Sequence, residues 1–195
     1  MIKAIIFDFF GVLVTSGLDQ FYDEYCQDPQ RNKKAKDLIR SFNSGLADIR
    51  YDEVIAQLAR LGGVSKEHVR QYLDDNRPNR KLLDYIINNL KRTYKVSILS
   101  NAGADWINEL LDKNDVRLFD DIVLSYQHGV TKPSREIYLL AAKRLGLEPK
   151  ECVFIDDTQR HCLAAEEAGM KAINYKDLEQ IKTDLEKLLS TSSDD

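Results

Sequence analysis

The sequence is poor in cysteine, and its three cysteines do not stand at the spacing of a metal-ligand motif. The number of cysteines (Cys26, Cys152 and Cys162) is odd, so they cannot all be paired in disulfides within the chain. We therefore expect reduced, partly buried cysteines of the kind found in cytoplasmic proteins.

A long hydrophobic run is also missing. The apolar stretch at residues 2–14 is interrupted by Lys3 and Asp8, and it is too short to cross a bilayer. It has neither the basic start nor the small-residue cleavage site of a signal peptide. These absences predict a cytoplasmic protein that has no membrane partner.

Charge of one sign is not in large excess, because the 195 residues carry a formal net charge of −4. So small a charge gives no long-range attraction to nucleic acid or to an anionic membrane. Basic clusters such as Lys91-Arg92 lie beside helical apolar patterns and are typical of a solvated helix face. No basic patch is interleaved with aromatic residues, so we exclude nucleic acid as a partner.

Short apolar runs instead alternate with amphipathic helical patterns, which is typical of an α/β protein with a parallel sheet. Five runs are expected to form buried strands: residues 3–8, 95–99, 121–124, 152–155 and 171–174. Apolar residues at helical spacing predict helices in five further segments: residues 82–90, 106–111, 137–145, 163–168 and 178–188. Residues 190–195 are expected to form a frayed polar tail.

One stretch breaks this alternation. Between about residues 15 and 77 there is no strand pattern, only helical patterns separated by turns such as Gly62-Gly63, with Ser65 as a new N-cap. A segment of this length is too long for an ordinary loop. It predicts an inserted all-helical cap at residues 16–77, which leaves residues 1–15 and 78–195 to form the α/β core.

Asp8 stands at the end of the first predicted strand. A carboxylate there points into the crevice where open α/β sheets bind ligands. Gly11 allows a sharp turn and would let backbone N–H groups approach an anion. Taken alone the pattern is weak, because an acidic residue after a strand is usually a helix cap or a turn former.

Polar residues also follow the next two strands. Ser100-Asn101 comes directly after the second strand, where a hydroxyl can donate to a phosphate oxygen, although both residue types are also good N-caps. Lys132 lies past the third strand and before Pro133, which restricts the backbone at the start of a helix. A lysine held there could neutralise a phosphoryl group, but solvated lysines are far commoner than functional ones.

The fourth strand ends in Asp156-Asp157. Two adjacent carboxylates repel each other unless a cation or hydrogen-bond donors compensate them. The pair is therefore a reasonable site for a hard cation. Because all four polar groups follow strands of one parallel sheet, they are expected to converge on one edge of it.

This set of motifs strongly resembles the haloacid dehalogenase (HAD) superfamily, in its branch of phosphatases that are similar to the N-terminal part of epoxide hydrolase. The resemblance covers nearly the whole chain and includes finer details at residues 118–121, 125, 129–133, 136–138 and 168–170. It implies a Rossmann-like core with a small inserted helical cap. It also implies a small phosphorylated substrate, and we expect a monomer or a weak homodimer.

The resemblance implies a role for each motif. Asp8 would be the nucleophile that forms an aspartyl-phosphate, and Mg²⁺ would be held by Asp8, the main-chain carbonyl of Phe10 and the acid pair. Of that pair, Asp157 is expected to be the direct ligand and Asp156 its partner.

The phosphoryl group has its own expected ligands. Ser100 and Lys132 would bind it as it is transferred, with Lys132 also restraining Asp8. Phe10, Gly11 and Asn101 are the further substrate-binding candidates.

Phe10 departs from the pattern of the phosphatases, most of which carry a second Asp there as general acid and base. The loss of such a group typically lowers the rate by about 10²–10⁴-fold. Three hypotheses follow, which we rank in this order: a magnesium phosphatase that favours good leaving groups, a very slow or non-catalytic phospho-ligand or protein-binding domain, and a 2-haloacid dehalogenase. The dehalogenases carry an aromatic residue at this position but generally lack the Asp-Asp pair.

Two further expectations concern residues outside the motifs. His161 follows the acid pair by four residues, where relatives often have Asn; it could touch the rim of the active site, but we interpret it as a helix-surface residue. Phe21, Tyr22 and Tyr25 in the first cap helix are candidates to face the substrate crevice.

Overall fold

The computed structural model describes residues 1–190. The tail expected at residues 190–195 lies outside the described residues, apart from Ser190, which ends the last helix. Within the described part of the chain, no helix is both long enough and apolar enough to cross a bilayer.

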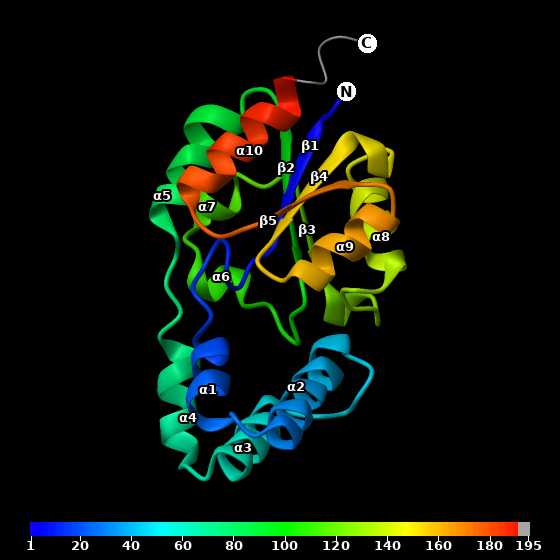
Figure 1. The fold of residues 1–195 in the computed structure, drawn as a ribbon. Coiled ribbons are helices and arrows are strands. Elements are labelled where there is room, and N and C mark those ends of the chain that lie inside the picture. Colours follow the sequence, from blue (N-terminus) through cyan, green and yellow to red (C-terminus); the bar gives the residue numbers. More distant parts are fainter. Residues whose placement is uncertain (191–195) are drawn as a thin grey trace.

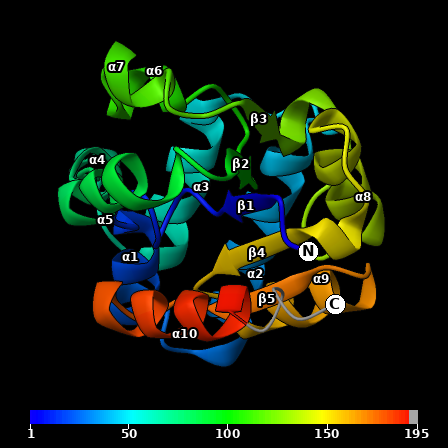
Figure 2. The same ribbon diagram turned by 90° about the horizontal axis from the view of Figure 1, so that it is seen from above.

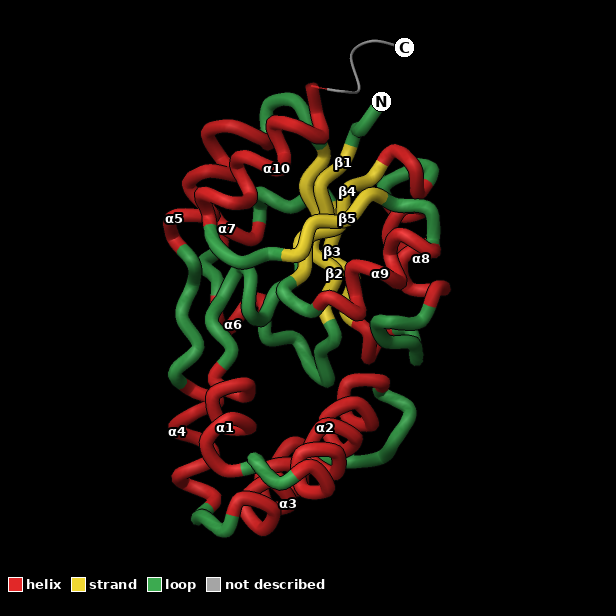
Figure 3. The backbone as a smooth tube through the Cα atoms, viewed as in Figure 1, coloured by secondary structure: helices red, strands yellow, loops and turns green. Residues whose placement is uncertain are grey.

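Five parallel strands form one sheet (Figure 3). They are β1 (Ala4–Phe7), β2 (Lys95–Ser100), β3 (Asp121–Leu124), β4 (Cys152–Asp156) and β5 (Lys171–Asn174). Their order across the sheet is β3-β2-β1-β4-β5, so β1 is the central strand. The predicted parallel α/β fold is confirmed, and each predicted strand agrees with the structure to within one residue at either end.

Helices cover both faces of the sheet (Figures 1 and 2). One face carries α5 (Arg80–Tyr85), which continues as the π-helical turn η1 (Ile86–Leu90), together with α6 (Ile107–Leu110), α7 (Lys113–Val116) and α10 (Leu178–Ser190). The other face carries α8 (Arg135–Arg144) and α9 (Gln159–Glu167). The short 3₁₀ turns η2 (Ser125–Gln127) and η3 (Pro149–Glu151) lie after β3 and before β4.

Alternation along β1 explains this three-layer arrangement. Successive side chains of a strand point to opposite faces of its sheet. Ile5 and Phe7 accordingly pack in the cluster under α5 and α10, whereas Ala4 and Ile6 pack under α8 and α9. All four are fully buried, so the central strand has to be apolar throughout.

The helix predicted at residues 106–111 differs from expectation. Leu111 has an extended backbone (φ −110°, ψ 145°), which ends α6 after one turn. Asp112 then accepts hydrogen bonds from the N–H groups of Asn114 and Asp115 and caps α7 as a separate helix. Apolar periodicity alone does not reveal this cap.

Four helices lie together beyond one end of the sheet (Figure 1): α1 (Gly17–Tyr25), α2 (Pro29–Ser44), α3 (Tyr51–Gly62) and α4 (Lys66–Asp74). We call residues 17–74 the helical block. It has a hydrophobic cluster of its own, separate from the two beside the sheet. Phe21 and Tyr22 are buried in that cluster, so the expectation that they face a substrate crevice is wrong.

Candidate functional site

The register of the strands brings two acids side by side. Phe7 of β1 lies opposite Ile98 of β2 and Ile155 of β4. Asp8, the next residue, donates its N–H to the carbonyl of Ile155 at 2.8 Å. Asp8 therefore stands beside Asp156, at the carboxyl ends of neighbouring strands.

Lys132 joins these two acids. Its Nζ lies 2.7 Å from Asp8 Oδ1 and 2.7 Å from Asp156 Oδ2. The side chains of Lys132 and Asp156 are 1% and 0% exposed, so water does not screen the three charges. The structure thus brings together three of the residues selected from the sequence, from segments up to 148 positions apart, counted from Asp8 to Asp156.

Burial and neighbouring charge set the pKa values of this cluster. Burial, with a smaller contribution from Asp156, raises the pKa of Asp8 well above its usual range, and Lys132 only partly offsets this. Burial would also raise the pKa of Asp156, but Lys132 and His161 outweigh it and hold that pKa below its usual range. Burial would lower the pKa of Lys132, yet the carboxylates of Asp156 and Asp8 keep it raised. Lys132 is therefore charged at neutral pH.

The backbone of Lys132 is held by Asn101. The side-chain Oδ1 of Asn101 accepts the Lys132 N–H at 2.8 Å, and its Nδ2 donates to the Lys132 carbonyl at 3.0 Å. Both polar ends of the Asn101 side chain are thus used to hold the lysine. Asn101 supports the site through Lys132 in this structure, and it does so from the loop that directly follows Ser100.

The hydroxyl of Ser100 has a different environment. Ser100 is 1% exposed, and its Oγ is buried with no hydrogen-bond partner among the described residues. Leaving a buried hydroxyl unsatisfied costs about 1–3 kcal/mol. An unpaired donor beside the Asp8 and Lys132 segments is what a site for a bound oxyanion would contain.

His161 is the residue for which sequence reasoning preferred the wrong one of two interpretations. Its ring lies with Nδ1 3.1 Å from both carboxylate oxygens of Asp156, and its side chain is only 13% exposed. The interpretation as a helix-surface residue is wrong, because the first turn of α9 packs back against the end of β4. A lone histidine has no periodicity or spacing that could have revealed this contact.

Asp156 is saturated by donors from the protein. Its Oδ1 accepts the N–H of Thr158 at 2.8 Å, its Oδ2 accepts Lys132, and the His161 ring lies against both oxygens. Burial, with a smaller contribution from Lys132, lowers the pKa of His161, so its ring is neutral at neutral pH.

The turn after β1 brings Gly11 against Asp157. The N–H of Gly11 donates to the Val14 carbonyl at 2.8 Å, so it closes the turn and does not face an anion as the sequence suggested. Gly11 has φ +85°, and a Cβ there would collide with the Asp157 carboxylate, whose Cγ would lie only 2.7 Å away. Gly11 therefore provides room for Asp157.

Asp157 is the least satisfied acid of the site. Among the described residues, its carboxylate has one side-chain donor, Thr158 Oγ1, at the long distance of 3.5 Å. Partial burial raises its pKa to about 6, and the neighbouring charges of Asp156 and Asp19 contribute further. A carboxylate that is crowded by other carboxylates in this way is stabilised by a nearby cation.

Asn174 supports the acid pair from β5. Its Nδ2 donates to the main-chain carbonyls of Asp156 at 3.2 Å and Asp157 at 2.8 Å.

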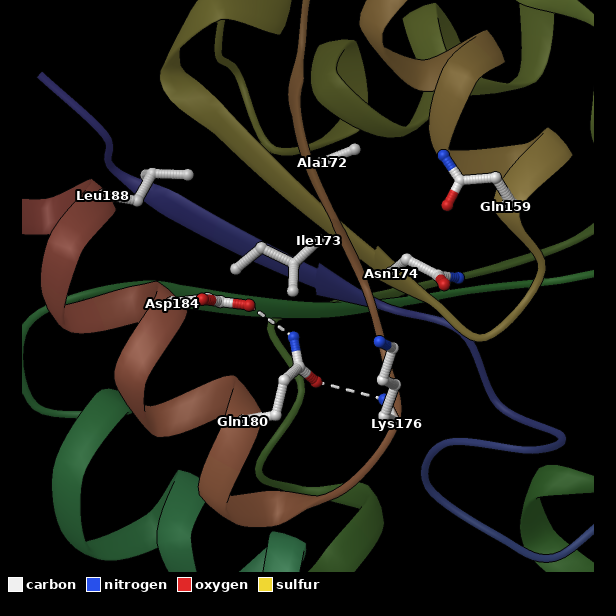
Figure 4. A pocket seen from close by; sticks show the side chains of 8 residues that line it. All are labelled: Gln159, Ala172, Ile173, Asn174, Lys176, Gln180, Asp184 and Leu188. Atoms are coloured by element: carbon white, nitrogen blue, oxygen red, sulfur yellow. Dashed lines mark hydrogen bonds between the residues drawn. The ribbon is translucent and has the colours of Figure 1, made fainter.

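A shallow hollow of about 410 Å³ lies between β5 and α10, and Asn174 is among the residues that line it. Within the hollow, Gln180 accepts the Lys176 N–H and donates to Asp184 (Figure 4). None of Asp8, Ser100, Lys132 or Asp156 lines this hollow, so it is separate from the candidate site.

The oxygen-rich donors fit a hard divalent cation. One ligand atom each from Asp8, Asp156 and His161 lie within 4.8 Å of one another, but Lys132 and Thr158 already donate to the two Asp156 oxygens. The Asp157 carboxylate lies over the adjacent Gly11. Carboxylate and carbonyl oxygens are the ligands that Mg²⁺ prefers. Phe10, the remaining candidate, is half-buried and packs edge to face on Phe9, with ring centroids 5.0 Å apart.

Comparison with known proteins identifies the family. Residues 2–169 match the family model of the haloacid dehalogenase-like hydrolases. The chain belongs to this family. The resemblance recognised from the motifs is therefore confirmed for the HAD superfamily as a whole.

Relatives of this HAD chain include phosphatases. D-ribitol-5-phosphate phosphatase of Bacteroides thetaiotaomicron is 29% identical over 88% of this chain and 90% of its own length. Sesquiterpene phosphatase AstK of Aspergillus oryzae is 25% identical over 90% of each. A HAD family enzyme of Bacteroides thetaiotaomicron, crystallised with magnesium and inorganic phosphate, has the same fold, with a TM-score of 0.69 and 23% identity over 90% of this chain and 95% of that one. The chain is thus a phosphatase-like HAD hydrolase.

Proposed function

We propose that this HAD protein is a magnesium-dependent phosphatase that hydrolyses a small phosphorylated metabolite through an aspartyl-phosphate on Asp8. One observation carries the proposal: a buried lysine bridges Asp8 and Asp156 beside the buried hydroxyl of Ser100, which has no hydrogen-bond partner within residues 1–190. Phosphoryl transfer needs mainly positioning and electrostatic stabilisation. This arrangement of a nucleophile, a cation and a free donor supplies both.

In the first step Asp8 attacks phosphorus. The contacts of Asp8 that are found within residues 1–190 engage Oδ1, which accepts the Phe9 N–H at 2.6 Å and faces Lys132. Oδ2 is therefore the oxygen that would form the new bond to phosphorus. The bond from phosphorus to the leaving oxygen breaks as this bond forms. Lys132 partly offsets the effect of burial on the pKa of Asp8, and Lys132 and Ser100 donate to the phosphoryl oxygens.

The two acids at the end of β4 have different roles. Asp156 is already saturated by Lys132, His161 and Thr158, so its role is to hold Lys132. Asp157, whose one side-chain donor among residues 1–190 is the distant Thr158 hydroxyl, is the member that would bind Mg²⁺ directly, together with Asp8 and the Phe10 carbonyl. When bound, Mg²⁺ would neutralise charge on the phosphoryl group.

In the second step water attacks the phosphorus of the aspartyl-phosphate, which releases orthophosphate and restores Asp8. Phe10 has no group that could protonate a leaving oxygen or activate this water. The leaving oxygen therefore takes its proton from water, and substrates with good leaving groups are favoured. We further propose that the helical block is a cap that covers the site and excludes bulk water.

The missing acid also favours one second candidate, a phospho-ligand-binding domain with little or no turnover. It would use the same Ser100, Lys132 and magnesium ligands. The two candidates differ only in whether a bound phosphoryl group is hydrolysed.

Release of phosphate from acetyl phosphate and p-nitrophenyl phosphate, with and without Mg²⁺, tests the proposal. We expect Mg²⁺-dependent turnover that Asp8→Asn lowers by about 10³-fold or more. Asp23→Asn, an exposed acid on α1, is the matched control and should keep full activity. Wild-type protein that binds phosphate but turns over neither compound would favour the binding domain. Turnover that survives Asp8→Asn would overturn the proposed mechanism.

A further inference from the structure

The helical block contacts the core at the carboxyl-terminal end of α2. Asn43 there donates its side-chain N–H to the main-chain carbonyl of Asn101 at 3.1 Å. The Asn43 carbonyl accepts the hydroxyl of Ser125, a buried core residue, at 2.5 Å. Asn43 is thus bonded at the same time to the loop after β2 and to the turn after β3.

Close packing surrounds these two hydrogen bonds. Gly103 lies so near the Phe42 ring that a Cβ at this position would come within 2.7 Å of Phe42 Cζ. At Gly45, a Cβ would come within 2.5 Å of the Tyr126 carbonyl oxygen. Both glycines allow backbone and ring to approach where a larger residue would hold the block away from the core. The block is therefore seated against the core and does not merely lie near it.

A continuous path leads from this contact to the reacting groups. Asn43 holds the carbonyl of Asn101, the side chain of Asn101 holds both backbone polar groups of Lys132, and Lys132 Nζ contacts Asp8 and Asp156. Ser100, the last residue of β2, directly precedes Asn101. Ser125 ties the path to the core by accepting the N–H of Ala102 at 3.0 Å.

We propose that Asn43 is a positioning residue through which docking of the helical block fixes Lys132 and Ser100 for phosphoryl transfer. This inference rests on the proposed function, because it assigns the control of that same site. When the block is away from the core, the Asn101 carbonyl loses its partner and the loop that directly follows Ser100 gains freedom. A displacement of about 1 Å at a catalytic group can cost about 10²-fold in rate.

The connections of the block are consistent with such a movement. Two chain segments join it to the core, and they lie side by side where Thr15 donates its N–H to the Arg77 carbonyl at 3.0 Å and accepts the Arg77 N–H at 2.8 Å. Away from this pair, the block meets the core mainly through the end of α2. Removing a contact at that end should therefore shift the docked population and leave the core intact.

The chain contains its own reporter of docking. Trp106 is the only tryptophan of the 195 residues, and its ring lies 4.9 Å from that of Tyr51, the first residue of α3 in the block. Burial raises the pKa of Tyr51 to about 12, in keeping with its enclosed position. Undocking would separate the rings and expose Trp106 to a quencher such as acrylamide.

The test compares three variants of the full chain. Asn43→Ala removes the donor, and Asn43→Asp keeps the shape but sets a carboxylate against the Asn101 carbonyl. Asn32→Ala is the matched control: it makes the same change in the same helix, 11 residues or roughly 16 Å earlier. Acrylamide quenching of Trp106 is measured in the free protein, and kcat and KM are measured for acetyl phosphate with Mg²⁺.

Loss of one hydrogen bond should lower the ratio of docked to undocked protein roughly fivefold in Asn43→Ala, and more in Asn43→Asp. We expect quenching to increase in both, with kcat falling about 3- to 30-fold and KM changing much less. Asn32→Ala should match the wild type. Combining Asn43→Ala with Asn101→Ala should cost less than the product of the separate effects, since both act through Lys132.

Two results would overturn the inference. One is unchanged quenching and kcat in both Asn43 variants. The other is a fall in kcat without any change in quenching, because docking would then not be the cause. Failure of the proposed function is distinguishable from either: wild-type protein would show no turnover, while the quenching of the Asn43 variants would still decide whether Asn43 holds the block.

Discussion

The ammonium of Lys132 lies 2.7 Å from a carboxylate oxygen of Asp8, and the lysine side chain is 1% exposed. The same ammonium serves Asp156 at an equal distance, so two buried carboxylates share one cation. The cluster keeps an excess negative charge, to which Asp157 adds at its edge. This imbalance is the physical reason why the site should attract a divalent cation.

Replacement of Lys132 by Met should be strongly destabilising. It leaves Asp8 and Asp156 buried without their cation, and breaking a buried ion pair in this way costs about 3–5 kcal/mol. Urea unfolding at pH 7 measures the loss, and Lys143→Met on the exposed side of α8 is the control. Addition of Asp8→Asn should recover part of the lost stability. A cost below about 1 kcal/mol would mean that Lys132 does not compensate these acids.

Asp157→Asn should stabilise the protein when Mg²⁺ is absent. The pKa of Asp157 is raised to about 6, so folding favours its protonated form, and stability falls as pH rises from about 4 to about 6. After a discount for its exposure, removal of the charge should gain about 1 kcal/mol at pH 8, or roughly 2–4 °C in Tm. The gain should vanish near pH 4.

Saturating Mg²⁺ should reverse this order. The wild type should then gain stability as RT ln(1 + c/Kd), where c is the free Mg²⁺ concentration, whereas Asp157→Asn should gain little. Thermal unfolding of the wild type and of Asp157→Asn is measured under four conditions, with EDTA or with Mg²⁺ at pH 4 and at pH 8. Asp23→Asn is the control. An equal response of Asp157→Asn and wild type to Mg²⁺ would contradict its assignment as the direct ligand.

Phe10→Asp should supply the missing acid and base. We expect kcat for alkyl phosphates to rise by about 10²-fold, with little change for p-nitrophenyl phosphate, whose leaving group needs no proton. Phe10→Asn is the control: asparagine has nearly the same shape as aspartate but cannot transfer a proton, so this variant should show no gain. If Phe10→Asp is folded and binds magnesium yet gains nothing on alkyl phosphates, the missing acid is not what limits the rate.

Gly11→Ala should weaken the proposed magnesium site by steric displacement of a ligand. The added Cβ would displace the Asp157 carboxylate, and φ +85° is strained for alanine. Gly146→Ala is the matched control, because Gly146 has φ +71° but, in the described part of the chain, no atom beyond its immediate neighbours in sequence lies within 4 Å of the place that an added Cβ would take. Both should lose about 1 kcal/mol for the backbone. Only Gly11→Ala should weaken Mg²⁺ binding measured by calorimetry.

The places of the strands along the chain and the convergence of Asp8, Ser100, Lys132 and Asp156 could be predicted from the sequence. Buried parallel strands are short apolar runs, and the residue after each one lies at the same edge of the sheet. The long helical stretch after the first strand likewise excluded an ordinary loop. Such features depend on neighbours along the chain, so a single sequence carries them.

Only the tertiary structure decided how these residues divide their work. His161 contacts Asp156 because α9 folds back on β4, and Asn43 contacts Asn101 across 58 positions of sequence. Phe21 turns inward because the helical block needs a core of its own. Each of these contacts depends on the packing of elements against one another, which residue type and spacing do not specify. The sequence determined which chemical groups meet at the sheet edge, and packing determined which of them remain free to bind a ligand.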